Sequence, residues 1–406
     1  MPEWLREDIM TPIAWIGVCA SFALCASAAA ADITLRAAVL RVDTPGPMPI
    51  SRLDLRPDDL GFAGGVLGNA DNATTGQFMG QTFTTVDVLA TPETADAEMH
   101  KLLDGGIPFI ITLADAATTL RLADMAGDTA LIFNASASAD SLRNADCRAN
   151  LLHVAPSDAM KADAVAQFLV WKRWSNWFLI EGSHPEDTAL ADAYRHAATK
   201  FGAKIVETRV FEDTGGARST DSGQAQVQAQ IPVFTQRAAE HDVVIAADDA
   251  GVFADYLPYH TWDARPVAGS GGLTPKSWHP AHEAWGATQW QTRFEKLARR
   301  GAWDEDYQVW MALRSIGEAA TRTNSDDFAT LVTYIRGPEF QLAAFKGQAL
   351  SFRPWDGQLR QPILLTAGPV TTSVSPQAEF LHQVSQLDTL GTDRPESGCT
   401  AMTQGE

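Results

Sequence analysis

The chain is poor in positive charge. Its 406 residues carry 31 Lys and Arg against 50 Asp and Glu, which gives a formal net charge of −19. Nucleic-acid binding needs clustered Lys and Arg to neutralise phosphates, so this composition argues against that class of protein. An anionic membrane surface would also repel the chain. The acidic balance is typical of a solvated surface and is also compatible with a cationic ligand.

Common enzyme motifs are missing as well. There is no G-x-x-x-x-G-K-S/T phosphate loop, and no G-x-G-x-x-G follows the first predicted strand. The nearest approach to a nucleophile elbow is Ala268–Gly272, centred on Ser270. An elbow must open a helix, and the next residues, 273–276, do not predict one. We therefore interpret the segment as a glycine-rich loop that lets backbone approach a ligand, with a hydrolase using Ser270 as the alternative.

The histidines show no metal-binding or triad-like pattern. The nine His residues have no triad-like spacing, and no Cys/His zinc-finger spacing occurs. His279 and His282, followed by Glu283, are too few for a metal site without a further partner. The segment Trp278–Glu283 instead predicts the start of a helix, with Pro280 in its first turn.

Cysteine is scarce, and two of the four residues lie near the N-terminus. Residues 11–31 are uncharged and end in Ala29-Ala30-Ala31, which is an A-x-A site for a signal peptidase. We expect residues 1–31 to be a signal peptide and the mature protein to be periplasmic; Met10 is an alternative start, and a retained anchor is an alternative to cleavage. Cleavage leaves Cys147 and Cys399, which predicts one disulfide that ties the C-terminal tail back to the earlier part of the chain, against two unpaired thiols.

From Asp32 onward, short β-like runs alternate with helical stretches, which is typical of an α/β fold of two or more domains. Helices are predicted over 158–171 and 305–321 from their 3.6-residue periodicity, and an exposed loop over 211–230. A β-hairpin is expected within 349–374, with its turn at 354–357. The predicted strands are 33–40, 82–89, 108–112, 130–134, 151–154, 177–180, 203–210, 243–246 and 266–268.

Three stretches carry a resemblance to a known family. In 145–211, a strand, a Pro-Ser-Asp turn, a long helix, a strand and a second helix resemble the second-lobe entry of type I periplasmic binding proteins of the branched-chain amino acid group. The segments DVVIAADDAGVFADYLPYHTWDARPVAGSGGL (242–273) and FKGQALSFRPWDGQLRQPILL (345–365) are similar to the branch found with pyrroloquinoline-quinone (PQQ)-dependent alcohol dehydrogenase systems. The resemblance covers about residues 32–399.

This resemblance implies two Rossmann-like lobes joined by a three-segment hinge, with a ligand cleft between them. The first lobe would be 32–153 with 276–338, and the second 154–275 with 339–375, crossed by a tail of 376–406. Ligand binding in the cleft would close the lobes and present them to the permease of an ABC importer. The expected protein is a monomer that performs no catalysis and needs no cofactor.

The family's ligand-binding positions can be carried over to this sequence. The first-lobe turn corresponds to Asp115, Ala116, Ala117 and Thr118, and the following pair to Ala137 and Ser138 after Ser136. Helix N-termini with small hydroxyls suit anions, but Asp115 would repel one. Glu186 replaces the tyrosine that stacks on the ligand, and Gly271 replaces the acid that holds its ammonium group. The amino-acid grip is therefore absent, and a branched-chain amino acid is not the expected ligand.

Two other ligand classes remain open. Asp115, Glu186, Asp248 and Asp249 are candidate ligands for calcium or a lanthanide, which quinoprotein dehydrogenases require; Asp248 and Asp249 are equally expected as helix caps. Otherwise Tyr256, Tyr259 and Trp262 would form aromatic walls for an alcohol-derived compound or the quinone cofactor. An alternative function with the same fold is a periplasmic sensor or accessory protein that contacts a quinoprotein dehydrogenase.

Overall fold

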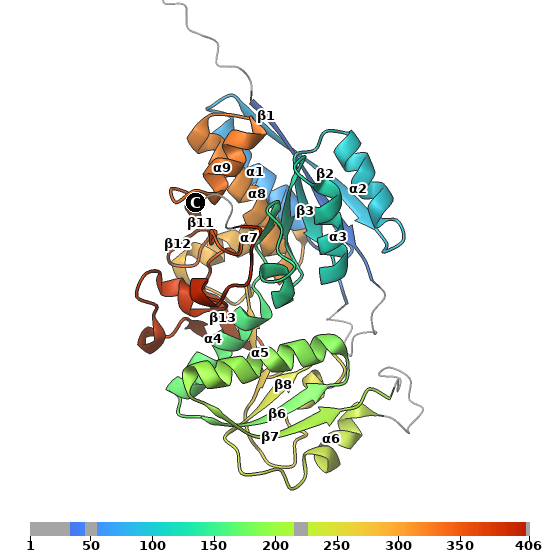
Figure 1. Ribbon diagram of the computed structural model, residues 1–406, viewed down its shortest axis with the longest axis vertical. Coiled ribbons are helices and arrows are strands. Elements are labelled where there is room, and N and C mark those ends of the chain that lie inside the picture. The colour runs from blue at the N-terminus through green and yellow to red at the C-terminus, as the bar shows by residue number, and fades with distance from the viewer. Residues whose placement is uncertain (1–32, 45–54, 215–225, 403–406) are drawn as a thin grey trace, which may run out of the picture. The chain divides into compact units, whose positions relative to one another are not determined.

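The computed structural model describes residues 33–44, 55–214 and 226–402. The first lobe is built on a parallel sheet covered on both faces by helices (Figure 1). Helices α1, α7, α8 and α9 pack on one face of this sheet, and α2 and α3 pack on the other. In spatial order the strands are β2 (Gln81–Ala90), β1 (Ile33–Val42), β3 (Phe109–Leu113), β4 (Leu131–Asn134) and β5 (Leu151–His153). The helices are α1 (Phe62–Gly76), α2 (Ala95–Asp104), α3 (Ala116–Ala126), α7 (Ala287–Ala298), α8 (Asp304–Thr323) and α9 (Phe328–Arg336).

The second lobe has a seven-stranded mixed sheet. Helices α4 (Asp158–Trp171) and α5 (Pro185–Phe201) cover one face, and α6 (Val227–Thr235) packs on the other. One strand from the C-terminal part of the chain, β13, runs antiparallel to its neighbours on both sides, so the edge strand β14 again runs in the direction of the other strands. In spatial order the strands are β14 (Val370–Ser375), β13 (Ile363–Ala367), β10 (Leu273–Lys276), β9 (Val267–Gly269), β8 (Val243–Ala247), β6 (Asn176–Gly182) and β7 (Lys204–Phe211).

The predicted α/β architecture is confirmed. All nine predicted strands are present with ends within two residues. Runs such as 109–113 and 243–247 are mainly apolar and buried along their whole length, as expected for strands covered on both faces of a sheet. The predicted helix 158–171 matches α4, whose first turn is closed by a hydrogen bond from the Met160 amide to the Ser157 hydroxyl.

Two local predictions were wrong. The helix expected from Trp278 begins only at Ala287, because Trp285 and Gly286 adopt left-handed φ values of 54° and 83° that the helix cannot include. The loop expected over 211–230 ends early, since Val227 already opens α6; residues 215–225 lie outside the described part of the chain.

The third crossover also lies elsewhere than predicted. Phe340, Leu350, Phe352 and Leu359 belong to the core of the first lobe, so residues 340–359 do not join the second lobe as the sequence suggested. This segment contains β11 (Leu342–Ala343) and β12 (Ala349–Leu350), and the predicted turn at 354–357 closes with the Gly357 amide donating to the Arg353 carbonyl. The chain therefore passes between the lobes at 154–157, 276–278 and 360–362.

The C-terminal tail follows β14 as irregular chain with short 3-10 turns. It contains the predicted disulfide, which joins Cys399 to Cys147 of the first lobe with a Cα–Cα separation of 5.7 Å. The predicted signal peptide lies outside the described residues. Within the described part of the chain, no helix is both long and apolar enough to cross a membrane.

Candidate ligand-binding site

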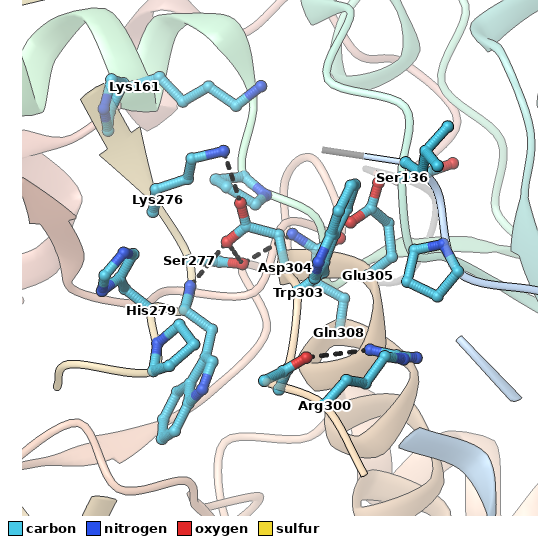
Figure 2. Close-up of a pocket in the computed structure, with 18 residues that line it drawn as sticks. Ser136, Lys161, Lys276, Ser277, His279, Arg300, Trp303, Asp304, Glu305 and Gln308 are labelled. Atoms are coloured by element: carbon cyan, nitrogen blue, oxygen red, sulfur yellow. Dashed lines mark hydrogen bonds and ion pairs between the residues drawn. The ribbon is translucent and has the colours of Figure 1, made fainter. Parts of the chain in front are cut away.

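A cavity of about 720 Å³ lies where the two lobes meet (Figure 2). The second lobe contributes Lys161 from α4, and Lys276 lies at the end of β10. The first lobe contributes the start of α8 and the Ser136 hydroxyl beyond β4. Further lining residues are Leu55, Pro57, Pro156, Pro275, Ser277, Trp278, His279, Pro280, Arg300, Gly301, Ala302, Trp303 and Gln308. Residues of both lobes therefore line this cavity.

Asp304 organises the wall formed by the start of α8. Its Oδ1 accepts hydrogen bonds from the Ser277 hydroxyl at 2.8 Å and the Trp278 amide at 2.7 Å. Its Oδ2 lies 3.4 Å from the Lys276 Nζ. The second crossover and the cavity therefore share one carboxylate.

The charged side chains of this wall shift one another's pKa values. Attraction to Asp304, opposed by burial, raises the pKa of Lys276, so this amine stays cationic. Burial and the adjacent Asp304 carboxylate raise the pKa of Glu305. Figure 2 shows the Glu305 carboxyl group directed into the cavity on the side of Ser136.

Lys161 is only loosely paired with the protein's own acidic groups. Its nearest acidic partner is the Asp158 Oδ1 at 3.5 Å, and its side chain keeps 28% exposure. By contrast, Arg300 is committed to Asp306 and Asp59, with hydrogen bonds of 2.6 to 2.9 Å. Of these two cations, only Lys161 is available to an incoming anion.

A smaller cavity of about 120 Å³ shares Lys161, Pro275 and Lys276 with the large one. Ser270 lies on its wall and accepts a hydrogen bond from the Asp248 amide at 3.1 Å. The residues after Ser270 form β10 instead of a helix, so the nucleophile-elbow geometry is not present. This arrangement agrees with the glycine-rich loop interpretation.

The first-lobe turn that was predicted to bind the ligand does not line a described cavity. Asp115 is the N-cap of α3, and its carboxylate accepts hydrogen bonds from the amide and hydroxyl of Thr118. Ala116 and Ala117 form the first turn of that helix and do not line either cavity. Ser136 does line the large cavity, and its hydroxyl donates to the Ala114 carbonyl at 2.8 Å.

The backbone of Ala137 and Ser138 makes hydrogen bonds near the first crossover. The Ala137 carbonyl accepts from the Arg143 guanidinium at 2.9 Å, and the Ser138 carbonyl accepts from the Asp158 amide at the start of α4. Neither residue lines a described cavity. Their backbone groups fix the entry of the chain into the second lobe.

The acidic residues predicted as ligands in the second lobe have different surroundings in the structure. Asp248 accepts hydrogen bonds from the amides of Val252, Phe253 and Ala254, so it holds the loop that leads into the 3-10 turn Ala254–Tyr256 instead of capping a following helix. Asp249 lines the smaller cavity, where burial and then Asp158 raise its pKa. Glu186 lies in the first turn of α5. The described residues contain no group of three or more His, Cys, Asp or Glu able to hold a metal, so the structure does not assemble the four predicted carboxylates.

The remaining second-lobe predictions concern packing and surface. A side chain at Gly271 would meet the Ala254 carbonyl oxygen at 2.3 Å from its Cβ, so close backbone packing explains the glycine. Tyr256 packs partly buried against the core beneath α6, whereas Tyr259 and Trp262 are exposed. None of the three aromatic side chains lines a described cavity.

Sequence reasoning missed Lys161, Lys276, Asp304 and Glu305. One signal was present for Lys161, which is the single Lys or Arg between Arg148 and Lys172 and stands in the first turn of a correctly predicted helix. Nothing in the sequence joined the start of α8 to α4, because they come from different lobes and meet only at the hinge.

Comparisons with known proteins agree with this architecture. The Periplasmic binding protein family matches residues 71–369. A branched-chain amino acid ABC transporter periplasmic ligand-binding protein from Burkholderia xenovorans has a TM-score of 0.70 at 15% identity, covering 91% of this chain and 100% of that one.

Two further solved structures are similar. A leucine-, isoleucine-, valine-, threonine- and alanine-binding protein from Brucella ovis has a TM-score of 0.65 at 14% identity over 87% of this chain and 93% of that one. An ABC transporter solute-binding protein from R. palustris in complex with benzoate has a TM-score of 0.62 at 12% identity over 90% and 99%. No curated protein matches the chain. Since the family match spans well over half of its length, this chain belongs to the periplasmic binding protein family, which implies a periplasmic location.

Proposed function

We propose that this chain is the solute-binding component of an ABC importer linked to a PQQ-dependent alcohol dehydrogenase system, and that it captures a small organic acid derived from an alcohol. The observation that carries the proposal is the interlobe cavity, in which Lys161 of the second lobe is available to a carboxylate. A ligand that contacts both lobes stabilises the closed form relative to the open one, and the permease would recognise that closed form.

The chemistry of the cavity favours an organic acid over a metal ion. A hard cation such as calcium takes six to eight oxygen ligands, whereas Lys161 and Lys276 would repel a cation and the described residues hold no metal-binding group. Glu305 faces the cavity with a raised pKa and can accept a hydrogen bond from a ligand hydroxyl. Benzoate and 3,4-dihydroxybenzoic acid occupy two structurally similar proteins, which supports the carboxylate class.

The link to alcohol oxidation rests on the resemblance of segments 242–273 and 345–365 to proteins of those systems. A pull-down from membranes of cells growing on an alcohol tests it. Recovery of an ABC permease supports the importer, and recovery of a quinoprotein dehydrogenase without a permease supports the sensor or accessory role.

Calorimetry of the full chain against short alcohols, their carboxylates, lanthanum, calcium and PQQ tests the ligand class. We expect a carboxylate to bind and Lys161→Met to weaken it about 10- to 150-fold, the equivalent of one charge-assisted hydrogen bond. Lys172→Met is the matched control, because Lys172 caps the far end of the same helix and stacks on Trp171. Lanthanum binding that Lys161→Met leaves intact, with no carboxylate bound, would refute the proposed ligand.

A further inference from the structure

The C-terminal tail contacts the second lobe through a buried glutamine. Gln167 of α4 is fully buried, and its Oε1 accepts a hydrogen bond from the Gln377 amide at 2.9 Å. Its Nε2 donates to the Thr389 hydroxyl at 3.1 Å. One side chain of the second lobe thus holds two points of the tail that are 12 residues apart in sequence.

A second anchor lies at Gly391. Its amide donates to Asp163 Oδ2 at 2.8 Å, and its carbonyl accepts from the Lys200 Nζ at 3.0 Å. Asp163 and Lys200 are themselves ion-paired at 2.7 Å between α4 and α5. Leu390 is buried in the core of the second lobe beside this pair. The tail therefore joins the helical face of that lobe with both polar and apolar contacts.

The same tail is fixed to the first lobe. Cys399 is bonded to Cys147, and the neighbouring Gly398 amide donates to Asn144 Oδ1 at 2.6 Å. Met402 and Leu387 lie in the core of the first lobe. Residues 387 and 390 thus contribute to different cores, although only three positions separate them.

A buried ion pair secures the point where the tail passes from one lobe to the other. The Asp388 carboxylate accepts from Arg353 Nε at 2.9 Å and Arg360 Nε at 2.8 Å. Arg353 also donates to the Leu390 carbonyl at 2.6 Å and is only 2% exposed. Arg360 belongs to the third crossover, so the tail is tied directly to the hinge.

We propose that residues 376–402 form a strap, a fourth connection between the lobes that restricts their rotation about the three crossovers. The crossovers themselves lie at the hinge, where they oppose rotation weakly. Gln167 stands ten residues along α4 from its Ser157 cap, about 15 Å from the hinge at 1.5 Å per residue. A tie placed at that distance must be strained or loosened when the lobes rotate. The strap therefore sets the range of lobe positions available before any ligand binds.

Distance measurement between spin labels tests this without a ligand, so its result is independent of the proposed function. Labels are attached at His100→Cys on α2 and Ala189→Cys on α5, both exposed, in the full chain with Cys19→Ser and Cys25→Ser. The first-lobe end of the strap is released by Cys147→Ser with Cys399→Ser. The second-lobe end is released at both of its anchors by Gln167→Ala with Asp163→Ala, a variant that also serves if the disulfide-free protein does not fold.

We expect each release to broaden the distribution of distances between the two labels. The variant with both ends released should broaden it by less than the sum of the two single effects, because a strap that is cut at one end no longer restrains the lobes. Lys172→Ala on the same helix is the control and should leave the distribution unchanged. Distributions that stay as narrow as in the parent protein after either release, or effects that add fully, would overturn the proposal.

Discussion

Lys346 offers a sharp test of how the hinge is held. Its side chain is 1% exposed, and its Nζ donates to the Ser277 carbonyl and, at 3.0 Å, to the Pro362 carbonyl. These carbonyls belong to the second and third crossovers, so one amine joins both. Two titratable groups interact with its charge: Asp304 attracts it, and His282 has a pKa that burial and then the Lys346 charge lower to about 4.

The magnitude follows from proton linkage. Burial lowers the pKa of Lys346 to about 7 from the ordinary 10.5, against the attraction of Asp304. Between these values the unfolded chain holds a proton that the native protein has lost, so the free energy of unfolding rises with pH. Integration over pH 7 to pH 9 gives a gain of about 2 kcal/mol from this group alone.

Urea unfolding of the parent chain and of Lys346→Met at pH 7, 8 and 9 isolates this contribution. All other titrating groups are common to both proteins, so the difference in unfolding free energy should change by about 2 kcal/mol in favour of the parent as pH rises. Lys346→Met also leaves two buried carbonyls without a donor, which lowers stability at every pH and does not alter the slope. Parallel stability curves for the two proteins would refute a depressed pKa at this position.

Three further predictions follow from particular contacts. Burial and the neighbouring Asp158 raise the pKa of Asp140 to about 6, so between pH 4 and pH 6 the native state holds a proton that the unfolded chain has lost. The unfolding free energy of the parent should therefore fall by about 2 kcal/mol from pH 4 to pH 7 relative to that of Asp140→Asn. A difference between the two proteins that stays the same at every pH contradicts this. Gly64→Ala should lower the free energy of unfolding by about 1–3 kcal/mol, because the new Cβ would lie 1.9 Å from the Asp306 carbonyl oxygen. A urea unfolding curve equal to that of the parent would show that α1 and α8 can move apart without cost. Reduction of Cys147–Cys399 should lower the unfolding free energy by about 2–4 kcal/mol, and a melting temperature unaffected by reductant would argue against a structural bond.

The sequence alone determined the layers and much of the order of elements. Fully apolar runs such as 243–247 have few alternatives to a strand buried on both faces, and a Ser cap before 158–171 marks where α4 begins. These signals are local, because each depends on residues within one element. The pairing of Cys147 with Cys399 was also accessible, since no other cysteine remains after the predicted cleavage.

Local signals failed where the chain conformation depends on distant contacts. The aromatic segment from Trp278 looks like a helix start, but Trp278 stacks on Tyr307 of α8 and donates from its indole to Gln291, and this packing holds it outside any helix. Residues 340–359 were assigned to the second lobe from the resemblance, but their apolar side chains would fit either core, and in the structure they pack in the first.

The tertiary structure alone decided the composition of the site. Asp115 and Asp248 are acidic residues that follow strand ends, where ligand sites gather, yet each carboxylate is already occupied by hydrogen bonds from backbone amides of its own lobe. Lys161 and Glu305 are ordinary helix residues in the sequence and become site residues because two helices from different lobes begin at the same hinge. Sequence patterns report what an element buries, whereas a site between lobes depends on which element ends face each other across the crossovers.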